Sequence, residues 1–245
     1  MIYHNRSSTD FGIFLNYPEP YMFAQREFQA VHVPGRSGDI IEDNGAFQNP
    51  IMTVPFEVVR PQRYTSWFSW NRDVAEWLDG YNYSYLKFSY QDDYVWEAYL
   101  NQAPTVTPTS PSDASGTFSF TVKPYLIKAS GTLMTEFPLN QGNIFNHESI
   151  ACYPDWKFTT GATDATAKSF TLKVNDKEYN FNGVSGTVFV DGENCQVSNE
   201  SGSINGSVQF ANNDTPRIEP GENSVTLSGD SITKMEWRPK WRCKA

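Results

Sequence analysis

The chain has 245 residues, of which 15% are aromatic and only 19% are charged, and its formal net charge is −9. So many apolar side chains and so few charges exclude a disordered chain, because burial of aromatic area offsets the loss of chain entropy. The acidic balance argues against nucleic acid as the main partner, since contacts to phosphate require Lys and Arg.

The N-terminus and the cysteines bear on the compartment. No apolar run approaches the roughly 18 residues of a membrane span, and residues 1–14 lack the apolar segment of a signal peptide. Cys152, Cys195 and Cys243 are too widely spaced for a zinc site and odd in number for a disulfide framework. We therefore expect reduced thiols, no membrane contact and assembly in a cytoplasm.

The composition changes along the chain. Residues 1–136 hold 25 of the 37 aromatic residues, whereas residues 137–245 are rich in Thr, Ser, Asn and Gly. Such a change predicts two domains with a boundary within residues 128–145. We take the domains as residues 1–136 and 137–245.

Several strands are predicted in the first domain. Residues 52–58 and 118–122 alternate apolar with polar or small side chains, which is typical of half-buried strands. Pro55 within the first run predicts an edge strand or a bulged one. Residues 86–90 and 94–100 predict a hairpin, and residues 103–116, with three prolines and no core pattern, predict a loop.

One helix is predicted between residues 61 and 80. The apolar residues of this segment fall on one helical face: Trp67, Trp70, Val74, Trp77 and Leu78. Pro61 suits a first turn, and Gly80 suits the position just after the last turn. We assign this Trp-rich face mainly to the core rather than to a contact with another subunit.

The second domain is almost wholly strand and turn by pattern. Apolar residues alternate within residues 170–174, 179–181, 188–190 and 225–227, and turn signals separate these runs. Further strands are predicted within residues 204–210 and 232–241. Short strands at this spacing are typical of a β-sandwich, so the chain is predicted to be mainly β.

Few residues suggest catalysis. The three histidines lie in no HExxH motif, and no GxSxG motif occurs. A glycoside hydrolase requires only two carboxylates, for which the candidates are Asp92, Asp93 and Glu97. Aspartates in such a turn more often serve turn geometry. We therefore predict a non-enzymatic protein without a metal or other cofactor.

Two further segments leave alternatives open. Residues 34–39 (PGRSGD) lack the frame of a phosphate-binding loop, so Gly35 and Gly38 are interpreted as positive-φ residues of a turn between strands. Arg36 and Asp39 can pair within this turn or with a neighbouring subunit. A carbohydrate-binding β-sandwich that contacts cell-wall saccharide is the alternative function, with these residues stacking on the sugar: Trp156, Trp237 and Trp241.

Several phrases, in their order along the chain, resemble the distal tail protein of long-tailed, siphovirus-type phages of Gram-positive bacteria. In the first domain these phrases are residues 33–39 (VPGRSGD), 45–49 (GAFQN), 76–78 (EWL), 86–89 (LKFS) and 118–125 (FSFTVKPY). In the second domain they are residues 174–177 (VNDK), 190–193 (VDGE), 220–223 (PGEN) and 237–242 (WRPKWR).

The resemblance implies a structural protein of the virion, in the tail tip or baseplate. The N-terminal domain would be a β-rich fold with one helix and a hairpin that assembles into a homo-hexameric ring. The C-terminal domain would be a galectin-like β-sandwich. The ring would join the tail tube protein to the baseplate, to the tail-tip or tail-associated lysin protein, and to receptor-binding proteins.

Two details qualify the resemblance. The second domain is short, which argues against an inserted carbohydrate-binding module and against host recognition by this chain itself. Aromatic and Arg side chains are favoured anchors at interfaces. The candidate residues of the ring interface are Arg36, Asp39, Phe47, Tyr90 and Tyr94.

Overall fold

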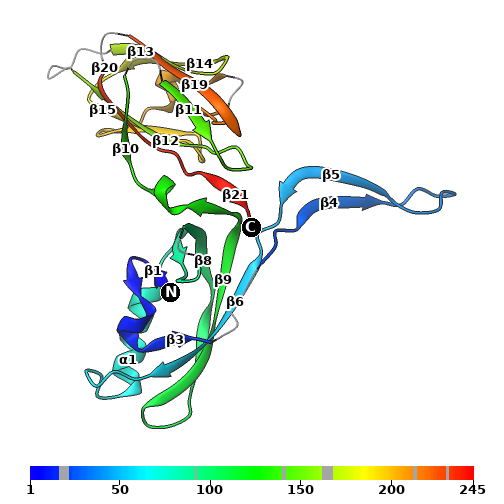
Figure 1. Cartoon of the computed structure of the whole chain (residues 1–245), viewed down its shortest axis with the longest axis vertical. Helices are drawn as coiled ribbons and strands as arrows, with labels where there is room; N and C mark the ends of the chain where they lie inside the picture. Colours follow the sequence, from blue (N-terminus) through cyan, green and yellow to red (C-terminus); the bar gives the residue numbers. More distant parts are fainter. Residues whose placement is uncertain (17–21, 92, 140–141, 162–167, 212–213, 230–231) are drawn as a thin grey trace. The chain divides into compact units, whose positions relative to one another are not determined.

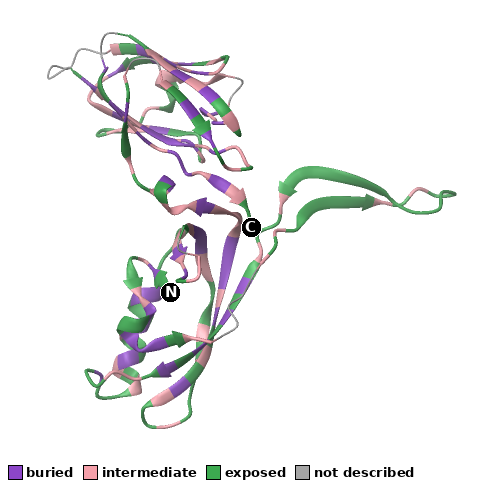
Figure 2. Ribbon diagram, in the orientation of Figure 1, coloured by how far each residue is buried: buried purple, intermediate pink, exposed green. Residues whose placement is uncertain are grey.

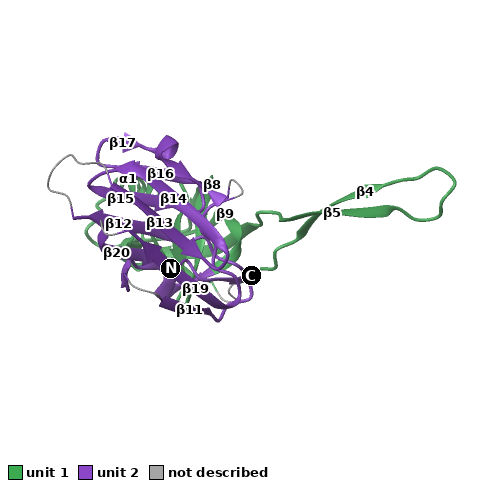
Figure 3. Ribbon diagram, turned by 90° about the horizontal axis from the view of Figure 1, so that it is seen from above, with its two compact units in different colours: residues 1–126, 244–245 green, residues 127–243 purple. Residues whose placement is uncertain are grey.

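The structure is a computed structural model that describes residues 1–16, 22–91, 93–139, 142–161, 168–211, 214–229 and 232–245. The chain divides into two compact units, residues 1–126 with 244–245 (unit 1) and residues 127–243 (unit 2) (Figure 3). Each unit has its own hydrophobic core. The units divide after Leu126, whereas the change of composition placed the domain boundary after residue 136.

Unit 1 is built on one sheet with the strand order β2-β1-β7-β8-β9-β6-β3 (Figure 1). Its strands are β1 (Ile2–Tyr3), β2 (Arg6–Ser7), β3 (Ile13–Leu15), β6 (Ile51–Val59), β7 (Ser84–Lys87), β8 (Tyr94–Pro108) and β9 (Asp113–Lys128). The terminal strand β21 (Arg242–Lys244), whose last residue belongs to unit 1, pairs with β9 off this path. A separate ribbon consists of β4 (Arg26–Val31) and β5 (Ile40–Phe47), and a 3-10 helix spans Ser8–Phe11.

The predicted alternation in residues 52–58 is confirmed. Along β6 every second residue is buried, because successive side chains of a strand point to opposite faces of the sheet. The buried members are Met52, Val54, Phe56 and Val58. Phe118 and Phe120 of β9 lie opposite Val54 and Met52 and complete this core face.

The prediction for Pro55 is wrong. Strand β6 lies between β9 and β3, and its register with β9 is continuous from Ile51 to Val59, so it is neither an edge strand nor bulged there. The carbonyl of Pro55 accepts a hydrogen bond from Asn16 N at 3.1 Å, just beyond the end of β3. The proline nitrogen lies on the same side as this carbonyl, so the missing N–H removes no bond to β9.

Helix α1 (Trp67–Leu78) packs its Trp-rich face into the core of unit 1, as predicted. The indole N–H groups of Trp70 and Trp77 donate to the carbonyls of Phe11 and Tyr3, each at 2.7 Å. Each buried indole is thereby both packed and hydrogen-bonded. The backbone of one adjoining segment therefore fixes the position of the helix on the sheet.

The helix begins later than Pro61 suggested. Ser66 is the N-cap, and its hydroxyl accepts from Ser69 N at 3.2 Å. Pro61 instead accepts from Tyr64 N in a turn before the helix. A serine hydroxyl satisfies an N–H group that the first turn leaves open, so the cap rather than the proline sets the start.

The predicted hairpin around residues 86–100 is confirmed, but the predicted loop at residues 103–116 is wrong. Strand β8 continues to Pro108 and β9 begins at Asp113, so most of this segment is a long hairpin. Thr109 N donates to Asp113 O at 2.8 Å and closes the turn. In the described part of the chain, β7 reaches along β8 only to Ala98, so Pro104 and Pro108 lie where one side of β8 has no partner strand, and Pro111 lies in the turn.

Unit 2 is a β-sandwich, as predicted. One sheet has the order β10 (Thr135–Phe137), β20 (Ile232–Arg238), β12 (Asp155–Thr160), β15 (Thr187–Asp191), β16 (Gln196–Asn199) and β17 (Gly202–Ser203). The other has the order β11 (Gly142–Asn146), β19 (Gly221–Ser228), β13 (Lys168–Val174), β14 (Lys177–Val184) and β18 (Val208–Gln209). Side chains from both sheets, among them Phe158 and Phe181, form one core.

Two predicted strands of unit 2 are shorter than expected. Within residues 204–210 only Val208–Gln209 forms a strand, because Asn205–Ser207 makes a 3-10 turn; a second 3-10 helix spans Ala129–Thr132. The last element breaks after Arg238, where Lys240 adopts a positive φ of 52°, and β21 follows. No helix among the described residues is long and apolar enough to cross a membrane.

Candidate functional site

Residues 26–47, here named the arm, form a ribbon of two strands that pair with each other in a sheet of their own. Nearly every residue of both strands is exposed (Figure 2). An isolated two-stranded ribbon is marginally stable at best in water. The arm therefore requires a surface to pack against.

Apolar side chains lie on both faces of the arm. Phe28 pairs with Asp43 and Ala30 pairs with Ile41, so Phe28 and Ile41 share one face. These two side chains are 49% and 60% exposed. Val31 and Ile40 pair on the opposite face. The arm therefore exposes apolar side chains on both of its faces.

Polar contacts hold the base of the arm. Arg26 forms an ion pair with Asp43, and its guanidinium lies 5.2 Å from the centre of the Phe47 ring. The Asp43 carboxylate also accepts from Gly45 N at 2.9 Å, where Gly45 has a φ of 74°. This bond and Arg26 lower the pKa of the Asp43 carboxyl. The sequence-predicted Phe47 is thus a half-buried support of the arm's base.

The tip of the arm is the turn predicted at residues 34–39. Gly35 and Gly38 both have a φ of 83°, which confirms their interpretation as positive-φ residues. Asp39 pairs with His32 at 3.1 Å rather than with Arg36. Arg36 forms no ion pair with another described residue, and both predicted site residues of the tip are exposed.

We expect the arm to loosen in acid because the folded state lowers the pKa of Asp43. A depressed pKa adds stability that is present above the ordinary value of 3.8 and is lost as the pH falls through the folded-state value. Amide exchange of the two arm strands, corrected for intrinsic rates, should therefore accelerate below about pH 4. Asp43→Asn should remove most of this pH dependence, and a variant with an unchanged profile would contradict the assignment.

The other two predicted site residues lie at the turn between β7 and β8 of unit 1. Tyr90 stacks on Phe88 with ring centres 5.3 Å apart and packs against the core, whereas Tyr94 begins β8. Both are half-buried. The five predicted interface residues thus fall on two separate elements, three on the arm and two beside the turn between β7 and β8.

An open groove lies on the face of the unit 1 sheet that points away from the α1-covered core. It has a volume of about 650 Å³ and is lined mainly by hydroxyl and amide side chains, including Thr53, Thr105 and Thr117. Its lining contains no charged residue and no histidine. The groove offers hydrogen bonds but no acid, base or metal ligand.

Of the carboxylates proposed for glycoside hydrolysis, the structure describes Glu97 and Asp93. Glu97 is buried and pairs with Lys123 at 2.7 Å, and their side chains are only 11% and 15% exposed. Asp93 is exposed, and Asp92 lies outside the described residues. Elsewhere in the described chain, no three His, Cys, Asp or Glu residues are grouped to hold a metal ion.

The tryptophans proposed for sugar stacking are mostly buried, so that part of the prediction is wrong. Trp156 is 0% exposed and Trp237 is 8% exposed. Their rings stack with centres 5.4 Å apart and pack against Phe137. Two sheets that close over alternating residues bury both rings, and this cannot be read from their positions in the sequence. Only Trp241 remains half-exposed.

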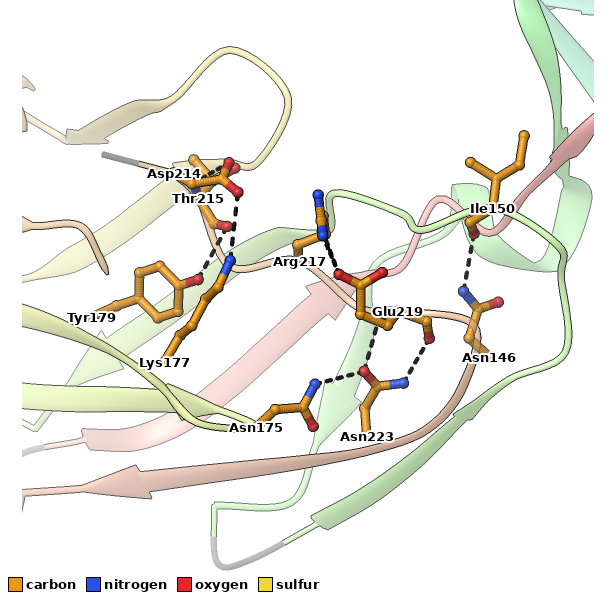
Figure 4. Close-up of polar contacts among 10 residues, drawn as sticks. All are labelled: Asn146, Ile150, Asn175, Lys177, Tyr179, Asp214, Thr215, Arg217, Glu219 and Asn223. Carbon is orange, nitrogen blue, oxygen red and sulfur yellow. Dashed lines mark hydrogen bonds and ion pairs between the residues drawn. The ribbon is translucent and has the colours of Figure 1, made fainter. Parts of the chain in front are cut away.

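A polar network fixes the loops at one end of unit 2 (Figure 4). Asn223 is 1% exposed, and its amide donates to the carbonyls of Glu219 and Gly221 at 2.7 and 3.0 Å. Its side-chain oxygen accepts from Asn175 Nδ2 and Glu219 N, each at 2.9 Å. Because every polar atom of this amide is satisfied, the network is structural. The sequence indicated turns here but not the amide that joins them.

Buried charges fix the C-terminal segment of unit 2. Asp155 is 4% exposed and receives Lys240 at 2.8 Å and Arg238 at 3.4 Å. Burial raises the pKa of the Asp155 carboxyl, and Lys240 opposes this effect. Arg242 pairs with Glu193 at 3.1 Å. Nearby, burial raises the pKa of the Cys152 thiol to about 12, which makes this cysteine unreactive.

No protein-family model matches the chain, and no curated protein matches it in sequence. Solved structures do. The hub protein Dit of phage SPP1, described as a paradigm of the hub adsorption apparatus in phages that infect Gram-positive bacteria, is 11% identical with a TM-score of 0.65. The match covers 96% of this chain and 95% of that one.

A second match is the baseplate of phage P2 in its activated conformation, solved with calcium and with strontium. A chain of that baseplate is 9% identical with a TM-score of 0.58, and the match covers 97% of this chain and 92% of that one. Both likenesses run across nearly the whole of each chain, through both units. The chain therefore has the mainly β fold of phage hub and baseplate proteins.

Proposed function

We propose that this protein is a non-enzymatic component of a phage tail, in which six copies form a ring. The ring joins the distal end of the tail tube to the baseplate or tail-tip device that attaches to the host. Its partners are further copies of itself, the tail tube protein, the tail-tip or tail-associated lysin protein, and baseplate or receptor-binding proteins. Assembly takes place in the host cytoplasm, and the protein remains in the virion.

The observation that carries this proposal is the full-length likeness to a phage hub protein, with 96% of this chain and 95% of the hub chain covered. A match of one unit alone would be weak evidence, because single β-sandwiches serve many unrelated functions. Agreement over nearly the whole of both chains supports a role in the same kind of assembly. The second match also comes from a baseplate.

The arm supplies the physical reason for self-assembly. Its strands expose Phe28, Ile40 and Ile41, which a lone copy leaves in water. In a closed ring each copy packs its arm on its neighbour, so the arm of every copy is covered. Arg36 at the exposed tip provides a planar cation that can reach a carboxylate of the next copy. Phe47, Tyr90 and Tyr94 remain predicted interface residues.

The ring is tested by native mass spectrometry and negative-stain images of the purified full chain. We expect a species of six times the chain mass of 27.8 kDa and a sixfold ring in projection. The same measurements with the tail tube protein of the same phage added test whether the ring forms on a template. A strict monomer under both conditions, at protein concentrations up to the solubility limit, would contradict the proposal.

A further inference from the structure

Unit 2 contains a small pocket of about 210 Å³ at the level where β9 ends and β11 leads into the next loop. Six side chains line it: Lys128, Ser130, Phe145, His147, Glu148 and Trp241. They come from three segments that are far apart in the sequence. Trp241 packs with one side against the buried aromatic core around Trp156, and none of the six has a role in the proposed ring.

Backbone contacts fix the three walls of this pocket relative to one another. Lys128 N donates to Trp241 O, and Lys240 N donates to Gly131 O, each at 2.9 Å. Gly131 permits this approach, because a Cβ atom there would lie 2.8 Å from Trp241 N. The main chain therefore holds the segment of Lys128 and Gly131 against the segment of Lys240 and Trp241.

The wall at residues 145–148 is held by Asn146, which is 1% exposed. Its oxygen accepts from Glu148 N at 3.0 Å. Its amide donates to Ile150 O at 3.2 Å, as Figure 4 shows. Ile150 in turn bridges to Arg242, next to Trp241. The pocket is thus formed in the free protein, as small-molecule sites usually are.

The lining combines aromatic rings with hydrogen-bonding groups. Phe145 is 55% exposed although it is a large apolar residue, and its ring centre lies 4.6 Å from that of His147. The rings of Trp241 and Trp237 lie nearly perpendicular, with centres 5.4 Å apart. Ser130 adds a hydroxyl, which both donates and accepts. A ring that stays half-exposed beside a preformed pocket is available to a ligand with an apolar face.

The charges in the pocket balance. Lys128 Nζ lies 3.6 Å from Glu148 Oε1, which is an ion-pair distance but longer than a hydrogen bond. The two side chains are 40% and 10% exposed. A hydroxyl group near this pair can accept from the ammonium group and donate to the carboxylate. A phosphate or carboxylate ligand would instead be repelled by Glu148.

We propose that this pocket binds one pyranose ring of a neutral saccharide. A pyranose presents a face of C–H groups to Phe145 or Trp241, and its hydroxyls can bond to the donors and acceptors of Lys128, Glu148, His147 and Ser130. The volume lies below the ~300 Å³ at which drug-sized pockets begin, which favours a single ring over a buried chain. This site is independent of the ring and of the proposed tail function.

The test uses the full chain and three probes: methyl α-glucopyranoside, methyl β-galactopyranoside and N-acetylglucosamine. Saturation-transfer NMR and titration should show saturable binding of at least one probe, with a Kd on the order of 1 mM. Phe145→Ala and Glu148→Gln should each weaken it about tenfold or more, because one removes the stacking ring and the other replaces a charged acceptor by a neutral amide. Phe68→Ala, which removes an 80% exposed ring on α1, is the matched control and should bind normally.

Three results would overturn the proposal. One is the absence of saturable binding of all three probes at concentrations roughly tenfold above the expected Kd. Another is binding that Phe145→Ala and Glu148→Gln leave unchanged while amide exchange shows both variants folded. The third is tighter binding of inorganic phosphate than of any glycoside in a competition titration, which would make the pocket an anion site.

Discussion

Asparagine in place of Asp155 is expected to destabilise unit 2 by about 3–5 kcal/mol, the usual cost of removing one partner of a buried ion pair. The substitution keeps the size of the side chain and removes its charge. Lys240, whose side chain is only 8% exposed, would then remain buried with its positive charge uncompensated. Gly192 N, which now donates to Asp155 Oδ1 at 3.3 Å, would lose a charged acceptor.

The measurement is urea unfolding of the full chain. Hydrogen exchange is the readout, because it reports on the two units separately. Unit 2 should lose stability and unit 1 should not, because Asp155, Arg238 and Lys240 all belong to unit 2. Glu178→Gln is the matched control: its ion pair with Lys173 joins side chains that are 58% and 45% exposed. Exposed pairs contribute about 0–1 kcal/mol, so this control should unfold almost as the parent protein does.

A double variant separates the charge from the packing. Asp155→Asn combined with Lys240→Met removes both buried charges and leaves an apolar stem in the place of the ammonium group. It should be more stable than Asp155→Asn alone, because no uncompensated charge remains. If Asp155→Asn costs no more than the exposed control, the buried pair does not hold the C-terminal segment as the distances indicate.

The sequence predicted those parts of the fold that depend on short-range patterns. Alternation in residues 52–58 identified β6, and one apolar face identified α1, because the period of the backbone acts within a few residues. The turn glycines Gly35 and Gly38 were predicted for a similar reason, since positive φ is a local requirement. The sandwich of unit 2 followed from many short strands at regular spacing.

The parts that were mispredicted depend on distant partners. The prolines of residues 103–116 indicated a loop, but β8 contains Pro104 and Pro108 because one of its sides has no partner strand past Ala98. Trp156 and Trp237 seemed suited to bind a sugar, yet the two sheets close over both. Asp155 and Lys240 carried no signal as a pair, because they are joined only in the folded unit.

The candidate sites show the same division. The sequence predicted the turn at residues 34–39 and gave Arg36, Asp39 and Phe47 as candidate interface residues. No local pattern shows that the two flanking strands pair apart from any core. Alternation in residues 26–31 would look the same in a strand of the main sheet. The pocket lined by Phe145, His147 and Trp241 was also not foreseen, because three distant segments form it.

Replacement of Phe28 and Ile41 by serine is expected to prevent ring formation while leaving the monomer folded. Both residues lie on one face of the arm and are about half exposed in the single chain, at 49% and 60%, so their loss removes little of the monomer's core. Substitutions at such positions usually change the free energy of unfolding by less than about 0.5 kcal/mol. At an interface, central apolar anchors are worth about 2 kcal/mol or more each.

The expected loss is repeated at every contact of the ring, since each copy uses the same arm. A cost of about 2 kcal/mol per contact corresponds to roughly 30-fold weaker association, and the double variant removes two anchors at each of them. Native mass spectrometry across a concentration series should therefore show monomer where the parent protein is hexameric. Hydrogen exchange of the main sheet of unit 1 should be unchanged.

The matched control is Phe68→Ser with Tyr81→Ser, which removes two aromatic rings that are 80% and 96% exposed on unit 1 but outside the arm. This control should still assemble, because overall surface hydrophobicity is lowered similarly while the arm is intact. A hexamer that persists in the arm variant would show that another surface closes the ring, such as the hydroxyl-lined groove along β6, β8 and β9. Loss of the hexamer in both variants would instead indicate nonspecific association through exposed aromatic residues, and the arm would then have no special role.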